Sequence, residues 1–243
     1  MAALGWLSRR LAEVPPGDEW LGEDERAALA TMHVERRRAD WRLGRFAAKA
    51  AVGAWLGVPP SCVQILAASD GAPEAWLDGC RADISVTLSH RGGVALAAVM
   101  GSAARAGCDL ELVEPRSDAF VRDYLTSAEQ RLTSAAGPAR DMAANLVWSA
   151  KESALKVLTT GLRRDTRSVE VTVTDLNPPE RTWSALRVRA AEGEVFPGWW
   201  RRSGTFLVTA CWPGGGPPPA ALEERSPIDT MRPSHRWIDR PVS

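Results

Sequence analysis

Residues 106–113 read AGCDLELV, and residues 141–158 read DMAANLVWSAKESALKVL. The first stretch predicts a β-strand, in which side chains two positions apart point to the same face. The second stretch repeats apolar residues at helical spacing and predicts a long helix, with Gly161 as its C-cap. This strand and this helix both carry charged side chains, and further helices and strands are predicted on either side of them.

The residues before the strand predict helices followed by a hairpin. Residues 22–56 have a helical pattern, which Pro59 and Pro60 end because proline cannot continue a helix. Residues 84–88 and 94–100 are two strand-like runs separated by SHRGG. This arrangement predicts a hairpin with polar residues at its tip.

The residues after the strand repeat the order of helices and then strands. Residues 118–134 predict a helix, which Thr126 or Ser127 can interrupt by capping a second segment. Strand-like runs follow the long helix, at residues 169–174, 183–190 and 205–212. The repeated order predicts an α+β fold of two comparable halves that meet near residue 105.

We therefore expect three parts in the chain. Residues 1–105 form an N-terminal subdomain, and residues 106–212 form a C-terminal subdomain that contains the acidic strand and the long helix. Residues 213–243 begin with a run of glycine and proline and continue with polar residues. Such a composition is typical of an irregular tail.

The composition is that of an ordinary globular protein of 243 residues, with 45% hydrophobic and 25% charged residues. The 30 basic and 30 acidic residues cancel. We therefore expect no strong attraction to nucleic acid or to an anionic membrane. The sequence has no apolar run long enough to span a membrane, no secretory signal pattern, and four cysteines without the spacing of a metal or disulfide framework. A cytoplasmic protein is expected.

Two carboxylates on the strand are the first candidate site. Asp109 and Glu111 lie two positions apart and therefore point to the same face. Two like charges close together are unfavourable unless a cation lies between them, and Mg²⁺ prefers such oxygen ligands. The alternative is an exposed strand face with ordinary solvated acids.

The helix supplies the second candidate group. Glu152 and Lys156 are one turn apart, and Lys151 precedes them. A third carboxylate with a neighbouring ammonium group would complete a site for magnesium and a polyphosphate. The alternative is a surface pair worth about 0.3–0.5 kcal/mol. Only three of the 30 basic residues are lysines, and two of those three lie in this segment.

The third group lies in the N-terminal half. Ser89 and His90 in the SHRGG segment, with Arg45 and Lys49 on the basic face of the preceding helix, are candidate phosphate contacts. The alternatives are a surface histidine and a solvated basic stripe. The sequence has no suitably placed GxSxG, P-loop or GxGxxG motif, so serine hydrolase, Walker-type and Rossmann sites are disfavoured.

Four segments together resemble the signature of the 4′-phosphopantetheinyl transferases, in the larger, Sfp-type branch. They are WRLGRFAAKAAV (41–52), ISVTLSHRGGVALAAV (84–99), AGCDLELVEPR (106–116) and LVWSAKESALKVLTTGL (146–162). The resemblance covers roughly residues 35–175. It implies two α+β subdomains related by a pseudo-twofold axis, a monomer, and coenzyme A bound in the cleft between the subdomains.

The resemblance also implies the reaction and the metal site. Phosphopantetheine moves from coenzyme A to a serine hydroxyl of an acyl or peptidyl carrier protein, and adenosine 3′,5′-bisphosphate is released. Mg²⁺, or Mn²⁺ in its place, would be bound by Asp109, Glu111 and Glu152. Glu152 is also the candidate base. The carrier protein would meet the segment at about 115–140, and its pathway, whether fatty acid, polyketide, nonribosomal peptide or siderophore, stays open.

The remaining site residues are implied as contacts to coenzyme A. By position in the motifs, Lys156 matches the lysine at the diphosphate and acts in catalysis. His90, with Ser89 beside it, matches the element that binds the 3′-phosphate, and Arg45 and Lys49 would assist there. The chain departs from the family at Ala72, where Gly-Lys-Pro is frequent, and Arg81 is a candidate replacement.

Two other functions remain open at this stage. A magnesium-dependent nuclease or phosphodiesterase also uses acidic pairs with a Glu/Lys element, but such enzymes generally need a basic track for nucleic acid. A binding module without catalysis could hold a carrier protein or a nucleotide. The retention of all three acids disfavours this second alternative.

Overall fold

Each half of the chain begins with a strand, continues with helices and ends with further strands; the sequence predicts the helices and several of the later strands of both halves, but not the strand at Gly5–Arg10. The computed structural model describes residues 4–224, 226–230 and 232–233. The N-terminal half contains β1 (Gly5–Arg10), α1 (Glu23–Ala30), α2 (Glu35–Leu56), β2 (Val63–Ala67), β3 (Pro73–Leu77), β4 (Cys80–Arg81), β5 (Ile84–Arg91) and β6 (Val94–Gly101). The C-terminal half contains β7 (Gly107–Leu112), α3 (Asp118–Tyr124), α4 (Ser127–Ala135), α5 (Arg140–Val157), β8 (Val169–Val173), β9 (Ser184–Ala190), β10 (Val195–Ser203) and β11 (Phe206–Cys211). A short last strand, β12 (Ala220–Ala221), follows.

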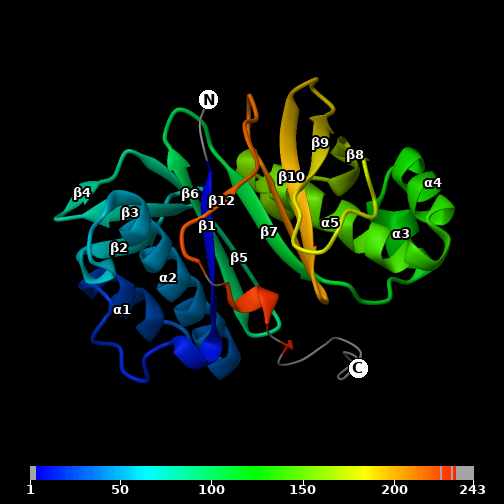
Figure 1. Ribbon diagram of the computed structural model, residues 1–243. Coiled ribbons are helices and arrows are strands. Elements are labelled where there is room, and N and C mark those ends of the chain that lie inside the picture. The colour runs from blue at the N-terminus through cyan, green and yellow to red at the C-terminus, as the bar shows by residue number, and fades with distance from the viewer. Residues whose placement is uncertain (1–3, 225, 231, 234–243) are drawn as a thin grey trace.

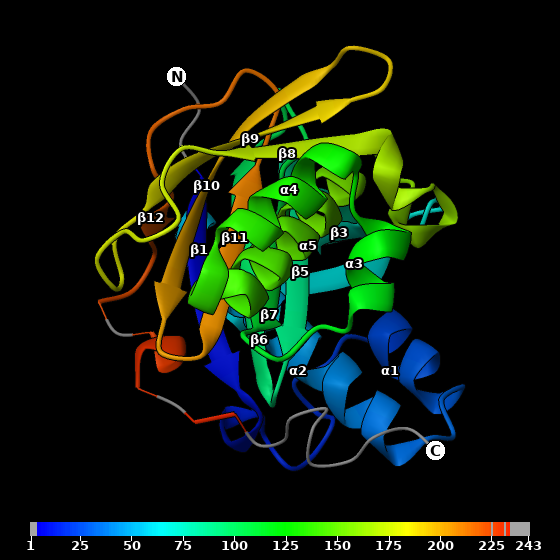
Figure 2. The same ribbon diagram turned by 90° about the vertical axis from the view of Figure 1, so that its right-hand side faces the viewer.

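In both halves the first strand pairs antiparallel with the last strand of the same half, β1 with β6 and β7 with β11. The first sheet has the order β12-β1-β6-β5, the second β7-β11-β10-β9-β8, and β2-β3-β4 form a small separate sheet. Helix α2 covers the first sheet and α5 covers the second (Figure 1). Figure 2 shows α4 and α5 in front of the second sheet. The α+β fold class is confirmed.

The two sheets share a core, and the alternation of side chains along each strand decides what faces it. In β6, Leu96 lies in the core between the sheets, whereas Ala97 packs on the side of α2. In β7, Leu110 lies in the core between the sheets. Its neighbours Asp109 and Glu111 therefore point the other way, toward α5. The layers follow one another as helix, sheet, sheet, helix.

A buried ion pair fixes the N-terminal helices to each other. Glu25 of α1 lies 2.7 Å from Nζ of Lys49 in α2, and both side chains are buried. Glu25 also accepts hydrogen bonds from the backbone amides of Gly22, at 2.8 Å, and Ile65, at 2.9 Å. One carboxylate thus joins the start of α1, the middle of α2 and strand β2.

The C-terminal half repeats this arrangement. Glu129 of α4 lies 2.8 Å from Nζ of Lys151 in α5, and it accepts from the amides of Thr126 and Val171, each at 2.7 Å. The parts correspond: an acid at the start of a short helix, a lysine in the long helix, and an amide of the next strand. This repetition supports the expectation of two similar halves, although the position of the boundary at residue 105 stays a prediction.

Several local predictions are corrected by the structure. The helix expected over 22–56 is two helices, α1 and α2. The turn between β5 and β6 consists of Gly92 and Gly93, with φ of 60° and 80°, a left-handed conformation that favours glycine. Ser89 and His90 therefore lie within β5 rather than at the tip of the hairpin. The predicted break at Thr126 is confirmed, since Thr126 is the N-cap of α4.

The end of α5 also differs from the prediction. Gly161 is left-handed, with φ of 51°, but it is not the cap; the helix ends at the C-cap Leu158, and the left-handed residue directly after it is Thr159, with φ of 57°. The amide of Thr159 donates to the carbonyl of Lys156 at 3.1 Å, and the amide of Thr160 donates to that of Leu155 at 3.2 Å. This is the Schellman pattern of a helix C-terminus, formed here with a β-branched residue where glycine is usual.

The segment expected to be an irregular tail is packed over its described part. Ala220 and Ala221 pair with β1, and Ile228 is 1% exposed. The composition could not indicate this, because the hydrogen-bond partners of Ala220 and Ala221 lie more than 200 residues earlier. The residues after 233 lie outside the described part. No helix among the described residues is long and apolar enough to cross a membrane.

Candidate active site

Asp109 is the centre of a network that joins both halves. Its side chain is buried, and Oδ1 lies 2.8 Å from Nζ of Lys156. Oδ1 also accepts a hydrogen bond from the hydroxyl of Ser89 in β5, at 2.8 Å, and Oδ2 accepts one from Ser149 in α5, at 2.8 Å. A buried carboxylate needs such partners, because leaving a charge unpaired in the interior is costly.

Glu111, two residues further along β7, has a different environment. Oε1 accepts from the indole nitrogen of Trp148 at 3.1 Å, and Oε2 lies 3.3 Å from Nε of Arg91 and 3.6 Å from Nη2 of Arg116. Burial raises the pKa of Glu111, and the charge of Asp109 raises it further against the opposing effect of the two arginines. The two acids of the strand therefore repel each other, as their spacing predicts.

Glu152 of α5 completes the acidic group. Burial raises the pKa of Glu152 to about 7, with further contributions from the charges of Asp109 and Glu111. Among the described residues, the Glu152 carboxylate has no hydrogen-bond partner and no ion pair. The charge of Lys156 opposes the rise in the pKa of Glu152 but does not cancel the effects of burial and of the two other acids.

The sequence suggests that a divalent cation binds to these three acids. Within the described part of the chain, no three His, Cys, Asp or Glu side chains are arranged as a ready set of metal ligands. The chemistry of the donors nevertheless fits a hard divalent ion: burial raises the pKa of Glu111 and of Glu152, the charge of Asp109 raises both further, and a cation would relieve that repulsion. Asp109, Glu111 and Glu152 are the residues that would hold it.

Lys156 links the acids to a cleft. Its ammonium group donates to the carbonyl of Cys108 at 2.9 Å as well as to Asp109. Burial by itself would lower the pKa of Lys156, but the charge of Asp109 and its hydrogen bond with the ammonium group oppose burial, and the pKa is raised. Lys156 therefore carries a positive charge at neutral pH.

A close approach of two backbones brings α5 to the acidic strand. A Cβ atom added to Gly107 would lie 1.9 Å from the carbonyl oxygen of Ser153 and 3.2 Å from Cβ of Lys156. No side chain can occupy that space, so glycine is required at this point of β7. The absence of a side chain lets the helix carry Glu152 and Lys156 to the face that presents Asp109.

The cleft has a volume of about 700 Å³ and is lined from both halves. Strand β5 contributes Ser85 and Thr87, and the C-terminal half contributes Ala106, Lys156 and the turn after α5. The cleft is therefore a feature of the contact between the halves, with Lys156 at the point where it meets the acids.

Two polar groups in the lining have no partner among the described residues. Nε of Arg45 is buried without a hydrogen bond, and the guanidinium lies 4.5 Å from the ring of Trp41. The hydroxyl of Thr160 is likewise buried and unpaired. Arg45 comes from α2 and Thr160 from the turn after α5, so a ligand in the cleft can be contacted from both sides.

The other residues predicted for this site lie as follows. Ser89 donates a hydrogen bond to Asp109 and is suited to hold the acid in place, while its contact with the 3′-phosphate stays a prediction. His90 is exposed and lies within reach of the charges of Asp109, Lys156 and Asp40. Lys49 is a correction: it is 2% exposed and paired with Glu25, so it does not reach the cleft.

The basic face predicted for α2 is also not simply solvated. Arg38 donates to the carbonyls of Leu29 and Met32, and Arg42 donates to that of Gly17 at 2.6 Å. These arginines fix the preceding segments onto α2, and Arg45 is the member of the series that lines the cleft.

Several residues of the site were not indicated by the sequence analysis. They are Arg91, Gly107, Arg116, Trp148, Ser149, Thr160 and Thr209. Trp148 and Ser149 lie just before Lys151 and Glu152 on α5, so their position on the helix could have identified them as site residues. Arg91 directly follows the predicted Ser89 and His90 in the SHRGG segment, so its position could have indicated it, whereas Thr209 comes from a distant strand and nothing local to it indicates the contact.

Comparison with known families gives an independent result. Residues 105–210 match the family model of the 4′-phosphopantetheinyl transferase superfamily. This range contains Asp109, Glu111, Glu152 and Lys156, and the resemblance of the sequence to the superfamily is confirmed. The match does not distinguish the Sfp-type branch. No curated protein shows a significant sequence match to the chain.

Among solved structures, the chain is similar to the holo-[acyl-carrier-protein] synthase of Thermotoga maritima. The identity is 22%, the alignment covers 52% of this chain and 76% of that one, and the TM-score is 0.34. A similarity this low carries no conclusion about function.

Proposed function

Residues 105–210 carry the pattern of the 4′-phosphopantetheinyl transferase superfamily, and on this basis we propose that the chain transfers phosphopantetheine from coenzyme A to a serine of a carrier protein. The family match supports the transfer in general. The Sfp-type branch, a monomeric state, a cytoplasmic location and the use of Mg²⁺ or Mn²⁺ are parts of the proposal that follow from the four sequence segments.

One observation carries the proposal. Lys156 lines the cleft and at the same time forms an ion pair with Asp109. A diphosphate in the cleft would therefore have an ammonium group on one side and the acidic group on the other. Coenzyme A has such a diphosphate between its nucleotide and its pantetheine arm, so the reacting phosphorus would lie where the two features meet.

The residues of the chain can be given roles in the displacement. The serine oxygen attacks the β-phosphorus, the bond from that phosphorus to the bridging oxygen breaks, and adenosine 3′,5′-bisphosphate leaves with the bond electrons. Lys156 places a positive charge where negative charge accumulates on the departing phosphate. A divalent cation held by Asp109, Glu111 and Glu152 would supply further charge neutralisation of the diphosphate.

Glu152 is the proposed acceptor of the serine proton. Its carboxylate is partly exposed and, in the described part of the chain, makes no hydrogen bond, so it is available to a substrate hydroxyl. Asp109 is less available for this step, because Oδ1 accepts from Ser89 and Lys156 and Oδ2 accepts from Ser149, which leaves Oδ2 one lone pair for the proposed cation. The proton balance is then complete, since the serine loses its proton to Glu152.

An aromatic cluster supports a carrier-protein surface beside the acids. Trp148, which donates to Glu111, lies 5.2 Å from Phe120 and 5.4 Å from Tyr124 between ring centroids. Tyr124 is 43% exposed. An exposed aromatic patch so close to the acids is suited to hold a partner protein whose serine must reach them.

The proposal is tested by incubating apo-carrier proteins with coenzyme A and Mg²⁺ and measuring their mass. We expect the mass gain of one phosphopantetheine with the wild type, and a rate at least about a hundredfold lower with Asp109→Asn. Failure of all tested carriers to gain that mass contradicts the proposal. Mg²⁺-dependent cleavage of DNA by the same preparation would favour a phosphodiesterase instead.

A further inference from the structure

The segment after β11 returns to the N-terminal half. We call residues 213–224 and 226–230 the C-terminal strap. The amide of Ala220 donates to the carbonyl of Leu4 and the amide of Leu222 to that of Trp6, each at 2.8 Å. The hydroxyls of Ser226 and Ser8 are 2.6 Å apart. The first part of the strap is therefore bound along the edge of β1 (Figure 1).

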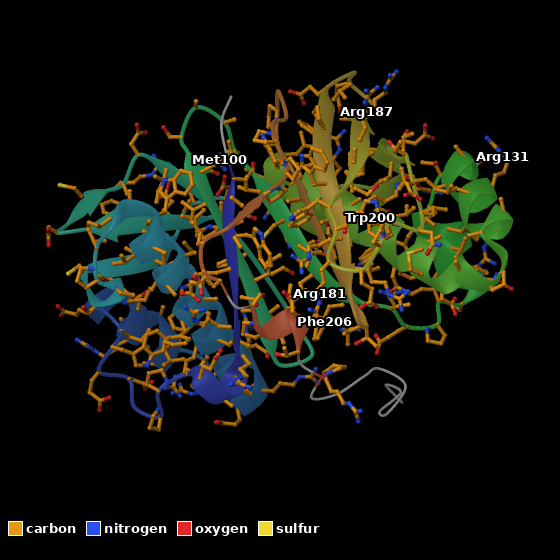
Figure 3. All side chains as sticks on the ribbon, viewed as in Figure 1. Met100, Arg131, Arg181, Arg187, Trp200 and Phe206 are labelled. Carbon is orange, nitrogen blue, oxygen red and sulfur yellow. The ribbon has the colours of Figure 1, made fainter. Side chains whose placement is uncertain are left out.

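The second part of the strap is bound to the C-terminal half. Ile228 enters the core between the two sheets. Asp229 accepts a hydrogen bond from the hydroxyl of Ser203 at 2.6 Å and forms an ion pair with Arg201, both on β10. The backbone carbonyl of Asp229 accepts from Arg181 at 2.7 Å, and Figure 3 shows Arg181 next to this part of the strap. The strap thus contacts both the N-terminal and the C-terminal half.

The chain beyond the strap contacts the hairpin that carries site residues. A Cβ atom added to Gly92 would lie 2.9 Å from Cβ of Pro233. Gly92 is in the turn directly after Arg91, which pairs with Glu111. Ser89, three residues before Gly92, binds Asp109. A contact at this turn therefore acts on the strand that orients both acids.

A segment that binds both halves can affect their relative position, because β5 and β7 are not joined as strands of one sheet. They are linked through side chains: Ser85 accepts from the amide of Ala106 and Thr87 from the amide of Cys108, each at 3.1 Å. These four residues line the cleft or adjoin it. A small shift of β5 against β7 would alter the width of the cleft.

We propose that the C-terminal strap sets the position of β5 against β7, and hence the affinity of the cleft for its nucleotide donor, with Asp229 as the positioning residue that ties the strap to β10. The statement about the donor rests on the proposed function. The statement about β5 and β7 does not, and the experiment tests the two separately.

The test compares Asp229→Asn with the wild type, and Glu192→Gln serves as the matched control. Glu192 also forms an ion pair, with Arg164, but both residues lie within the C-terminal half. If Asp229→Asn keeps the cleft in its binding form about a fifth of the time, the Kd for coenzyme A by calorimetry and the KM rise about fivefold while kcat changes little. Glu192→Gln should leave both constants unchanged.

Amide hydrogen exchange supplies the readout that is independent of function. The amides of Ala106 and Cys108 should exchange faster in Asp229→Asn than in the wild type, because their acceptors lie on β5. Ser226→Ala, which removes the hydrogen bond to Ser8, is the second variant if Asp229→Asn does not fold.

The outcomes separate the two ideas. Unchanged exchange at Ala106 and Cys108 in a folded strap variant overturns the proposal. A lower Tm with unchanged exchange, Kd and KM assigns the strap a stabilising role alone and also overturns it. Faster exchange in a protein whose wild type neither binds coenzyme A nor modifies a carrier supports the role of the strap and rejects the proposed function.

Discussion

Glu152→Gln should make the metal-free protein more stable at pH 8 while it removes transfer activity. The reason is the crowding of three acids. The pKa of Glu152 is raised from an ordinary value of 4.5 to about 7. An acid whose pKa is higher in the folded state binds its proton more tightly when folded. Stability due to this group is therefore present below pH 4.5, decreases as the pH rises to 7, and is absent above that.

The magnitude follows from the width of that interval. At about 1.4 kcal/mol for each pH unit the full effect is about 3 kcal/mol, and screening by water at the partly exposed carboxylate reduces it to about 1–2 kcal/mol. Glutamine cannot ionise, so the Glu152→Gln variant should not lose stability in this way as the pH rises. The difference in free energy of unfolding between variant and wild type should grow in favour of the variant from pH 4.5 to pH 7.

The assay is denaturant unfolding at several pH values in the presence of EDTA. Glu194→Gln, a change at an exposed glutamate on the turn before β10, is the control and should show no such trend. Excess Mg²⁺ should then stabilise the wild type, by about 1.4 kcal/mol at ten times Kd, but not Glu152→Gln. A variant that is less stable than the wild type at pH 8, or a difference that does not change with pH, would refute the reasoning.

Three further predictions concern single positions. Gly107→Ala should lower the free energy of unfolding by about 2–3 kcal/mol and reduce transfer, because its Cβ would collide with the backbone of α5. A denaturant-unfolding curve that gives the wild-type free energy of unfolding would contradict this. Thr159→Gly should raise stability by about 0.5–1 kcal/mol by relieving the left-handed conformation, and a lower Tm would show that the threonine is not strained. His90→Ala should raise the KM for coenzyme A but not for dephospho-coenzyme A, and equal effects on both donors would remove its role at the 3′-phosphate.

Asp109→Ala should lower stability as well as activity. Replacement by alanine would leave the ammonium of Lys156 and the hydroxyls of Ser89 and Ser149 without the carboxylate that they bind. Removal of one partner of a buried pair costs about 3–5 kcal/mol. Asparagine keeps the hydrogen-bonding shape, so Asp109→Asn is the variant that separates catalysis from folding.

The part of the site that depends on local periodicity could be predicted from the sequence. Asp109 and Glu111 share a face because a strand repeats every two residues, and Glu152 and Lys156 lie one turn apart because a helix repeats every 3.6. The break at Thr126 was equally local, since a threonine followed three residues later by a glutamate forms a capping box. In each case the sequence contains both partners within a few residues.

The lysines show where this kind of inference fails. By sequence, Lys49 continues the basic series of α2 and Lys151 adjoins Glu152. In the structure both are buried, with Glu25 and Glu129 as partners, whereas Lys156 reaches the cleft. The helical spacing of Lys49 is correct, but Lys49 pairs with Glu25 instead of lining the cleft, and Glu25 lies 24 residues earlier in the chain.

The amino-acid sequence by itself determined the α+β class, the recurrence of helices and then strands in both halves, though not the strand that opens the first half, and the pairs of charged residues that belong to one face of one element. These features depend on interactions between near neighbours in the chain. The tertiary structure decided which face is covered, how closely α5 approaches Gly107, which lysine reaches the cleft, and that the last described segment joins β1 to β10. Those features depend on contacts between residues tens to hundreds of positions apart, and the packing of the whole chain selects them.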